Sequence, residues 1–181
     1  EQGVQDDIDV YFATFAKSMA GIGAFLAGNK DVIQYLQYNM RSQTFAKSLP
    51  MAMVKGALKR LDMLRTMPEL KEKLWANTNG LQSGLRAAGF DLGTTQTCIT
   101  PVFLKGEIPE AMAMVNDLRE NHGIFCSIVV YPVIPKGLII LRLIPTATHT
   151  KEDIDETITA FSAIRKLLEN GTYKKIAASI V

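Results

Sequence analysis

Lys17 is the first residue whose type and position could support chemistry. It directly follows a β-branched and aromatic stretch, residues 9–15, and it precedes a turn that contains Gly21 and Gly23. An amine is thereby placed at the end of a predicted strand, where α/β proteins bind ligands. A partly desolvated amine favours its neutral form, which is a nucleophile and can form a Schiff base with a carbonyl. A lysine in this position is also commonly an ordinary solvated residue.

Arg142 is the second such residue, because it is a charge inside an otherwise apolar stretch, residues 138–144. A charge in such a strand needs either a partner or a solvent-exposed face. Strand alternation places Arg142 on the same face as Ile140 and Ile144. It could simply point into solvent, or it could bind an anion, since a guanidinium pairs with a carboxylate through two parallel hydrogen bonds.

Hydrophobic periodicity predicts the elements that would position these two residues. Strands are predicted at residues 9–15, 98–104, 124–131 and 138–144, with a further short apolar run at 24–27. Helices are predicted at residues 31–40, 50–64, 68–89, 110–121 and 150–171. Residues 41–48 are expected to form a polar connection, and no structure is assigned to residues 172–181.

The last part of this order, β-α-β-β-α, predicts helices on one face of a mostly antiparallel sheet. Thr150 is expected to cap the final helix, since a threonine hydroxyl can accept a hydrogen bond from a backbone N–H of the first turn. Glu152 and Asp153 would then lie in that turn, where the helix dipole favours negative charge. The two helices between residues 50 and 89 are expected to connect the two halves of the chain.

Composition excludes several classes of protein. The formal net charge is +2 with acids and bases intermixed, which gives no electrostatic case for binding nucleic acid. No apolar run approaches the ~20 residues that span a bilayer, so no transmembrane segment is predicted. Cys98 and Cys126 fit no zinc pattern, and no metal site is expected. We interpret them as reduced core thiols, which together with the lack of a signal peptide indicates a cytoplasmic protein.

Residues 7–25 resemble the cofactor-lysine segment of the α-oxoamine synthases, which are fold-type-I enzymes that use pyridoxal 5'-phosphate (PLP). The resemblance implies that Lys17 binds PLP through a Schiff base and that Thr14 hydrogen-bonds the cofactor phosphate. Ala16 stands where the family usually has serine, and Ala24 where it usually has glycine. Neither departure removes the chemistry of the lysine.

Residues 45–50, Phe-Ala-Lys-Ser-Leu-Pro, resemble a family segment that reaches across a dimer interface towards the partner's phosphate. Ala46 has no hydroxyl where the family usually has one. Lys47 could supply a cation in its place, or it could be an exposed loop lysine. The pattern of phosphate contacts is therefore left open.

Residues 135–150 are similar to the C-terminal segment of the family that contains its carboxylate-binding arginine. This resemblance implies that Arg142 binds the carboxylate of an amino-acid substrate. His149 and Thr150 match a His-Thr pair of the family, and we interpret both as structural. His122, next to Gly123, is interpreted as a residue of a helix terminus.

The resemblance covers essentially the whole chain, which would be the C-terminal half of a family member. This sequence would then begin inside a larger protein. It implies an α/β fold, in which the end of the large-domain sheet of a fold-type-I PLP-dependent transferase is followed by a C-terminal α+β domain. Residues 1–48 would be the C-terminal part of the large PLP-binding domain, residues 49–89 the connecting helices, and residues 90–181 the α+β domain.

Within the family, the segments are most similar to bacterial serine palmitoyltransferases. This similarity implies a PLP-dependent acyltransferase of sphingolipid biosynthesis that condenses L-serine with a long-chain acyl-CoA, with decarboxylation, to an aminoketone. Lys17 would be the catalytic base. A homodimer with shared active sites is implied, and this chain alone is expected to be inactive, because other cofactor contacts of the family lie upstream.

Other functions remain open. Glycine C-acetyltransferase and 8-amino-7-oxononanoate synthase share the same family skeleton. A non-catalytic α+β module that binds a small molecule would leave the Lys17 segment unexplained. An interaction protein could use the leucine stripe at residues 70–85, although that stripe is more simply explained by packing within the chain.

Overall fold

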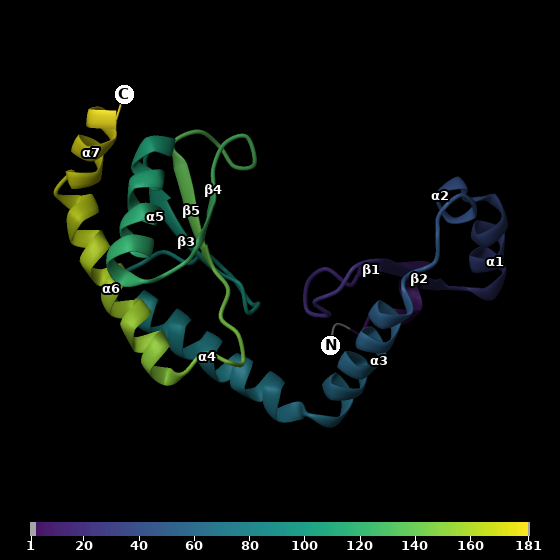
Figure 1. The fold of residues 1–181 in the computed structure, drawn as a ribbon. Helices are drawn as coiled ribbons and strands as arrows, with labels where there is room; N and C mark the ends of the chain where they lie inside the picture. Colours follow the sequence, from purple (N-terminus) through teal and green to yellow (C-terminus); the bar gives the residue numbers. More distant parts are fainter. Residues whose placement is uncertain (1–2, 181) are drawn as a thin grey trace. The chain divides into compact units, whose positions relative to one another are not determined.

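The computed structural model describes residues 3–180, and the chain divides into two units, Glu1–Pro68 and Glu69–Val181. The first unit is built around a β-ribbon (Figure 1). Strand β1 (Val10–Thr14) follows a short 3-10 helix, η1 (Gln5–Asp7), and pairs antiparallel with β2 (Ala24–Gly28). Because Thr14 lies opposite Ala24, the residues between them form the connection that carries Lys17.

Three helices follow the ribbon: α1 (Lys30–Asn39), α2 (Arg41–Thr44) and α3 (Met51–Thr66). The prediction of a helix at 31–40 is confirmed by α1, which begins where the Asn29 side chain accepts a hydrogen bond from the Asp31 backbone N–H at 2.9 Å. The prediction of a polar connection at 41–48 is wrong for its first four residues. They form one helical turn because the carbonyl of Met40 accepts hydrogen bonds from the backbone N–H groups of residues 43 and 44.

The apolar residues of β1 are more exposed than predicted. Val10, Tyr11 and Phe12 are 40%, 46% and 61% exposed, although the composition of this strand is typical of a buried one. The reason is that β1 pairs only with β2 among the described residues, and a two-stranded ribbon offers few neighbours to bury side chains.

The second unit contains a three-stranded antiparallel sheet in the order β3-β5-β4, formed by β3 (Thr100–Lys105), β4 (Ser127–Val129) and β5 (Leu138–Leu143). Four helices cover one face of it (Figure 1). They are α4 (Pro68–Ala87), α5 (Ile108–His122), α6 (Lys151–Glu169) and α7 (Thr172–Ile180). The predicted β-α-β-β-α order and one-sided layer are confirmed.

The core of the second unit lies between the sheet and these helices. From β5, Ile139, Leu141 and Leu143 point inward, and they belong to one cluster with buried residues of all four helices. Helices α4 and α6 approach closely at Gly84, where a Cβ would lie 2.2 Å from the Cδ1 atom of Ile158. Only glycine leaves room for this contact, so the α4–α6 packing depends on that position.

Residues 172–180, for which no structure is predicted from the sequence, form α7. Tyr173 is 1% exposed and is among the largest fully buried side chains of the described residues. Gly171, with φ of 73°, separates α6 from α7, because the left-handed conformation ends a helix and suits glycine. Residues 172–180 therefore form a packed helix.

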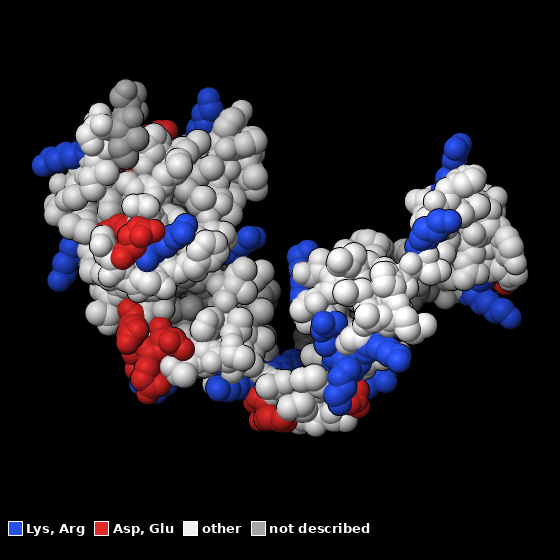
Figure 2. All heavy atoms as spheres, viewed as in Figure 1, with Lys and Arg blue, Asp and Glu red and all other residues white. Residues whose placement is uncertain are grey.

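Charged side chains of both signs are interspersed over the visible face of the second unit (Figure 2). The ion pairs Lys151–Asp155 and Arg165–Glu169 join residues one turn apart on a helix. Exposed pairs of this kind contribute little to stability. Among residues 3–180, no helix is both long and apolar enough to cross a membrane.

Candidate active site

Lys17 lies in a loop that turns back on itself at the end of β1. The backbone N–H of Phe15 donates to the Gly23 carbonyl at 2.8 Å, and the N–H of Gly21 donates to the Phe15 carbonyl at 2.7 Å. Inside this closure, the N–H of Ala20 donates to the carbonyl of Lys17 at 2.8 Å. Three backbone hydrogen bonds therefore fix the position of the Lys17 backbone relative to the strand.

The loop contains two left-handed residues. Ala20 has φ of 41°, which is uncommon for a residue with a Cβ, and Gly23 has φ of 106°. A Cβ at Gly23 would also lie 2.9 Å from the methyl carbons of Leu49, the residue that packs against this turn. Neither the strain at Ala20 nor the contact of Leu49 follows from a sequence pattern, because both depend on how the loop closes.

The side chains of Lys17 and Thr14 are both exposed in the first unit. Partial burial of the lysine was expected, but the described residues of this unit do not cover the loop. An accessible amine can form a Schiff base with an aldehyde, and a threonine hydroxyl can donate a hydrogen bond to a phosphate oxygen. The amine and the hydroxyl at this end of β1 are therefore the types of group that suit the aldehyde and the phosphate of PLP.

An apolar pocket of about 230 Å³ lies between the Lys17 loop and α3. Phe15, Met19 and Ile22 line it from the loop, and Arg60 reaches it from α3. A Cβ at Gly21 would lie 3.7 Å from an Nη atom of Arg60, so this half-buried guanidinium approaches the loop backbone. This arginine could not be identified from sequence patterns, because its contact with the loop depends on the packing of α3.

Lys47 is exposed in the segment between α2 and α3, as is Ala46 beside it. Leu49, in the same segment, is the residue that packs on Gly23. The segment 45–50, which resembles a family segment that reaches towards a phosphate, is therefore in contact with the Lys17 loop through Leu49. A role for Lys47 itself stays a prediction.

Arg142 lies on β5, the central strand of the second unit's sheet, and its side chain is exposed. The residues on either side of it along the strand, Leu141 and Leu143, are buried in the core. Arg142 therefore lies on the face of the sheet away from the helices. The alternation of the strand predicted only that it shares a face with Ile140 and Ile144. Its Nε donates a hydrogen bond to the Oγ of Ser127 on β4 at 3.0 Å.

Among residues 3–180, no carboxylate forms a hydrogen bond or an ion pair with Arg142. The residues directly opposite it are Pro101 on β3 and Ser127 on β4, and neither carries a charge. The positive charge of the guanidinium is thus not neutralised within the second unit. A role for Arg142 in binding an anion stays a prediction.

His149 stabilises the turn between β5 and α6. Its Nδ1 accepts a hydrogen bond from the backbone N–H of Thr146 at 3.0 Å. The Nδ2 of Asn77 donates to the carbonyls of Thr146 and His149 at 3.0 and 2.8 Å. Because Nδ1 is an acceptor here, a neutral His149 carries its proton on Nε2. These contacts confirm the structural interpretation of His149.

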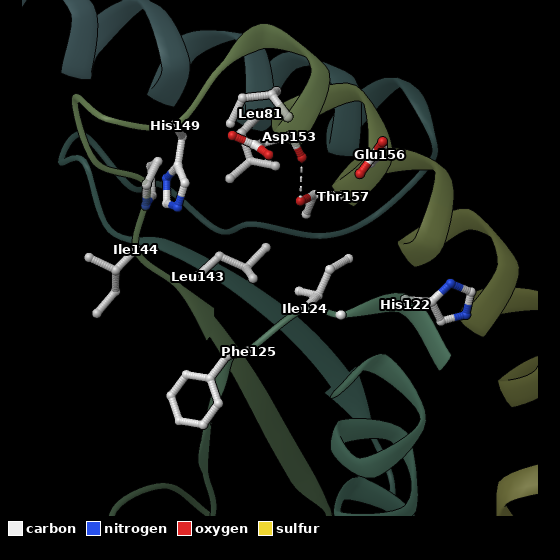
Figure 3. Close-up of a pocket in the computed structure, with 13 residues that line it drawn as sticks. Leu81, His122, Ile124, Phe125, Leu143, Ile144, His149, Asp153, Glu156 and Thr157 are labelled. Carbon is white, nitrogen blue, oxygen red and sulfur yellow. Dashed lines mark hydrogen bonds between the residues drawn. The ribbon is translucent and has the colours of Figure 1, made fainter. Parts of the chain in front are cut away.

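His122 and His149 both line a pocket of about 300 Å³ in the second unit. They lie at opposite ends of it, with Leu143 and Ile124 between them (Figure 3). His122 is the last residue of α5, before Gly123 in the left-handed conformation, so its predicted place at a helix terminus is confirmed.

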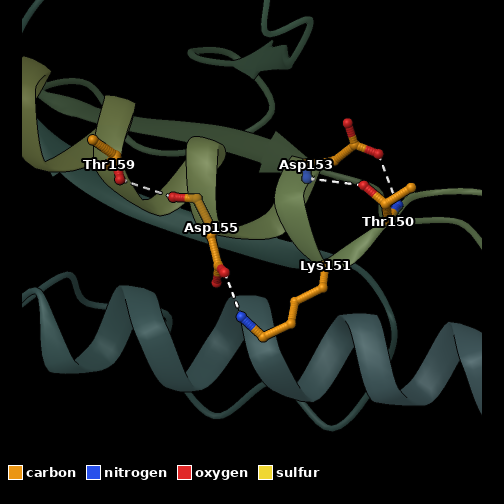
Figure 4. Close-up of polar contacts among 5 residues, drawn as sticks. All are labelled: Thr150, Lys151, Asp153, Asp155 and Thr159. Atoms are coloured by element: carbon orange, nitrogen blue, oxygen red, sulfur yellow. Dashed lines mark hydrogen bonds and ion pairs between the residues drawn. The ribbon is translucent and has the colours of Figure 1, made fainter.

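Thr150 caps α6, as predicted. Its hydroxyl accepts a hydrogen bond from the backbone N–H of Asp153 at 3.2 Å, and its own backbone N–H donates to the Asp153 carboxylate at 2.7 Å (Figure 4). The backbone N–H of Thr150 and, to a smaller extent, its side chain interact with the Asp153 carboxylate and hold its pKa below the usual value. The carboxylate is therefore part of a helix cap, and its hydrogen bonds account for its position.

Cysteine nucleophiles and metal clusters do not contribute to the described site. Cys98 and Cys126 are both free, and burial raises the pKa of the Cys126 thiol to about 11. A thiol with so high a pKa is a poor nucleophile at neutral pH. Among residues 3–180, no group of three His, Cys, Asp or Glu side chains could hold a metal ion.

The residues singled out in the sequence thus fall into two groups. Lys17 and Thr14 share one end of the ribbon in the first unit, whereas Arg142 belongs to the second unit. Sequence reasoning missed Ser127, the hydrogen-bond partner of Arg142. Its only sequence signal is that it is a polar residue within an apolar run, and its pairing depends on the register of β4 against β5.

The Aminotransferase class I and II family matches residues 1–161 of the chain. A cysteate-C-fatty acyltransferase of Capnocytophaga ochracea is 72% identical over 179 residues, which are 99% of this chain and 43% of that protein. A serine palmitoyltransferase of Sphingobacterium spiritivorum is 38% identical over 167 residues, which are 92% of this chain and 41% of that protein. The chain thus spans about two fifths of the length of these curated relatives.

Solved structures with the same fold include one of SPT (serine palmitoyltransferase) with a PLP internal aldimine. It superposes with a TM-score of 0.81 and 33% sequence identity, over 90% of this chain and 41% of the solved one. The fold class predicted from the sequence is thereby confirmed.

Proposed function

The chain belongs to the aminotransferase class I and II family, and on that premise we propose that it is the C-terminal part of a PLP-dependent C-acyltransferase of the α-oxoamine synthase type. The enzyme would join an α-amino acid to a fatty acyl group carried as a thioester. Coenzyme A and CO2 would leave, and an aminoketone would form. One observation carries this proposal: a lysine amine stands at the closed turn after β1 in a chain 72% identical to a C-fatty acyltransferase.

PLP is the cofactor that the family and its solved members indicate. When bound, it supplies an electron sink that stabilises negative charge at the substrate Cα. Lys17 would hold its aldehyde carbon and Thr14 its phosphate, since both groups are accessible at the same end of β1.

Lys17 and Arg142 would then carry out separate steps. Arg142 would bind the substrate carboxylate through two parallel hydrogen bonds and so orient the Cα–H bond. The amine of Lys17 would also be the base that removes the Cα proton.

The preferred amino acid is proposed to be L-cysteate. The relative with 72% identity has cysteate in its name, whereas the serine palmitoyltransferase of Sphingobacterium spiritivorum is only 38% identical. Cysteate carries a sulfonate in place of the serine hydroxyl, so the two substrates differ by one negative charge. L-serine, the substrate expected from the sequence, is the second candidate, and the likeness to solved SPT favours it.

The organisation of the whole enzyme is part of the same proposal. Residues 1–48 would complete a large PLP-binding domain, residues 49–89 would connect, and residues 90–181 would form the C-terminal α+β domain. The enzyme would be a cytoplasmic homodimer with shared active sites, as the family resemblance implies. With L-serine its product would enter sphingolipid biosynthesis, and with L-cysteate it would be a sulfonated aminoketone.

The cofactor assignment is tested by borohydride reduction of the whole protein, followed by peptide mass spectrometry. A pyridoxyl group is expected on the peptide that contains Lys17, because borohydride reduces a Schiff base to a stable amine. The Lys17→Ala variant should lose both the adduct and turnover. Lys55→Ala, which removes an exposed lysine of α3, should retain both. An adduct that persists in Lys17→Ala would contradict the assignment.

The substrate assignment is tested by measuring the release of coenzyme A with different substrate pairs. L-cysteate and L-serine are compared with palmitoyl-CoA as donor, and glycine and L-alanine with short and long donors. The highest kcat/KM with L-cysteate supports the first candidate, and the highest with L-serine supports the second. A preference for glycine or L-alanine would favour one of the sister enzymes instead.

A further inference from the structure

Ser127 contacts both the side chain and the backbone of Arg142. The Oγ of Ser127 accepts the hydrogen bond from the Nε of Arg142 at 3.0 Å, and it donates a longer one to the carbonyl oxygen of the same residue at 3.5 Å. The two residues lie directly opposite each other in the β4–β5 ladder. The Ser127 hydroxyl is therefore hydrogen-bonded to both the guanidinium and the backbone carbonyl of Arg142.

No other residue directly opposite Arg142 can do this. Residues directly opposite each other in adjacent strands share a face of the sheet, so Pro101 and Ser127 are its two nearest cross-strand neighbours. Proline has no polar side-chain atom. Among these neighbours, Ser127 alone can fix the direction of the guanidinium.

The hydrogen bond also decides which nitrogens remain for a ligand. A guanidinium carries one N–H on Nε and two on each of its terminal nitrogens. Because Ser127 occupies Nε, a carboxylate would approach the two terminal nitrogens end-on rather than from the Nε side. A long side chain that is already held in place also loses less conformational entropy when the ligand binds.

We propose that Ser127 is the positioning residue that holds Arg142 for the carboxylate of the amino-acid substrate. This inference rests on the proposed function. Ser127 acts through Arg142 and does not itself contact the substrate. It should therefore affect the affinity for the amino acid, and it should leave cofactor loading and the KM for the acyl donor unchanged.

The test uses the whole PLP-loaded protein and three variants: Ser127→Ala, Ser127→Thr and Ser83→Ala. The Kd for L-cysteate and for L-serine is measured from the change in cofactor absorbance. Ser127→Ala should raise the Kd of the substrate roughly three- to tenfold, the effect expected from one lost hydrogen bond. Ser127→Thr keeps the hydroxyl and should remain within about twofold of the wild type. Ser83→Ala, on the exposed side of α4, should match the wild type.

Amines without a carboxylate separate positioning from a general structural effect. Taurine corresponds to cysteate without its carboxylate, and ethanolamine corresponds to serine without it. Their Kd values should be the same in the wild type and in Ser127→Ala, because neither ligand reaches Arg142. PLP content and Tm should also be unchanged in this variant.

Three results would overturn the inference alone: equal amino-acid Kd values in the wild type and Ser127→Ala, equal losses in the Ala and Thr variants, or weakened binding of the carboxylate-free amines. A wild-type protein that binds no PLP, or whose absorbance no amino acid changes, would overturn the proposed function and this inference together.

Discussion

The hydroxyl of Tyr173 in α7 donates a hydrogen bond to the Oδ2 of Asp117 in α5, which joins the last helix of the chain to a helix 56 residues earlier. The two residues line a cavity of about 630 Å³ beside these helices. Burial, together with the hydrogen bond to Asp117, raises the pKa of Tyr173, so its hydroxyl remains a donor at neutral pH. This contact is the main polar attachment of α7 among the described residues.

Tyr173→Phe should loosen α7 without removing its buried ring. The variant loses one hydrogen bond to a charged acceptor, and the expected cost is about 1–3 kcal/mol in the free energy of opening. Hydrogen exchange of α7 amides, followed by mass spectrometry, measures this cost directly. Tyr35→Phe, at an exposed position of α1, serves as the control. Unchanged exchange in α7 of the Tyr173 variant would show that ring burial alone holds the helix.

The α5–α7 contact should weaken in acid. Burial raises the pKa of Asp117, but hydrogen bonds from Asn121 and Tyr173 and the charge of His122 lower it by more, so the folded value lies below 3.8. A carboxylate of this kind stabilises the fold above its unfolded pKa, and this stabilisation is lost as the pH falls through the folded pKa. Asp117→Asn should therefore show a smaller loss of α7 protection below about pH 4 than the wild type.

The pH comparison needs a carboxylate control on the same helix. Glu120→Gln removes an exposed acid of α5 that does not contact Tyr173. It should reproduce the acid sensitivity of the wild type. If Asp117→Asn and the wild type lose protection in parallel, the Asp117 carboxylate is not the group responsible.

Replacement of Arg142 should weaken substrate binding and leave the fold intact. Arg142→Ala should raise the amino-acid Kd at least about 30-fold, as expected for a lost bidentate contact to a carboxylate. Arg142→Lys restores the charge but not the planar fork, so it should recover only part of the affinity. Tm and PLP content should not change, because Arg142 lies on the exposed face of β5. Arg86→Ala, at an exposed position of α4, is the control. An unchanged Kd in Arg142→Ala would refute its role as the carboxylate-binding residue.

The two cysteines should differ in reactivity. Cys126 is 4% exposed and its pKa is raised to about 11, whereas Cys98 is only partly buried. At pH 8 the thiolate is the reactive form, so iodoacetamide should label Cys98 first and Cys126 only after unfolding. Cys98→Ser should remove the fast phase. Rapid labelling of Cys126 in the folded protein would indicate that the segment just before β4 opens far more readily than the burial of Cys126 implies.

The parts of the fold that could be predicted are those with local causes. Alternation of buried residues along β5 placed Arg142 on the outer face, and the Thr150 hydroxyl marked the start of α6. By contrast, α2 is a single turn and is too short to show periodicity. Helix α7 is held by a tyrosine whose partner lies in another helix, so its own sequence did not reveal that it packs.

Predictions about the site were limited in the same way. The chemistry of Lys17 and Arg142 could be inferred from their residue types and neighbours in the sequence. Ser127 could not be found, because its contact with Arg142 depends on the pairing of β4 with β5. The apolar residues of β1 suggested burial, but burial depends on neighbouring elements, and β2 is the only strand that pairs with β1 among the described residues.

Strand β5 also bears on how enzymes with this fold could diverge. Substitutions at Ile139, Leu141 or Leu143 would leave cavities in the core, each costing about 2–5 kcal/mol when the side chain is truncated to alanine. Substitutions at Arg142 or at its neighbour Ser127 change the outer face, where a typical cost is within about 0.5 kcal/mol. The affinity for the amino-acid carboxylate can therefore change through this face, without the prior accumulation of compensating mutations that stabilise the protein.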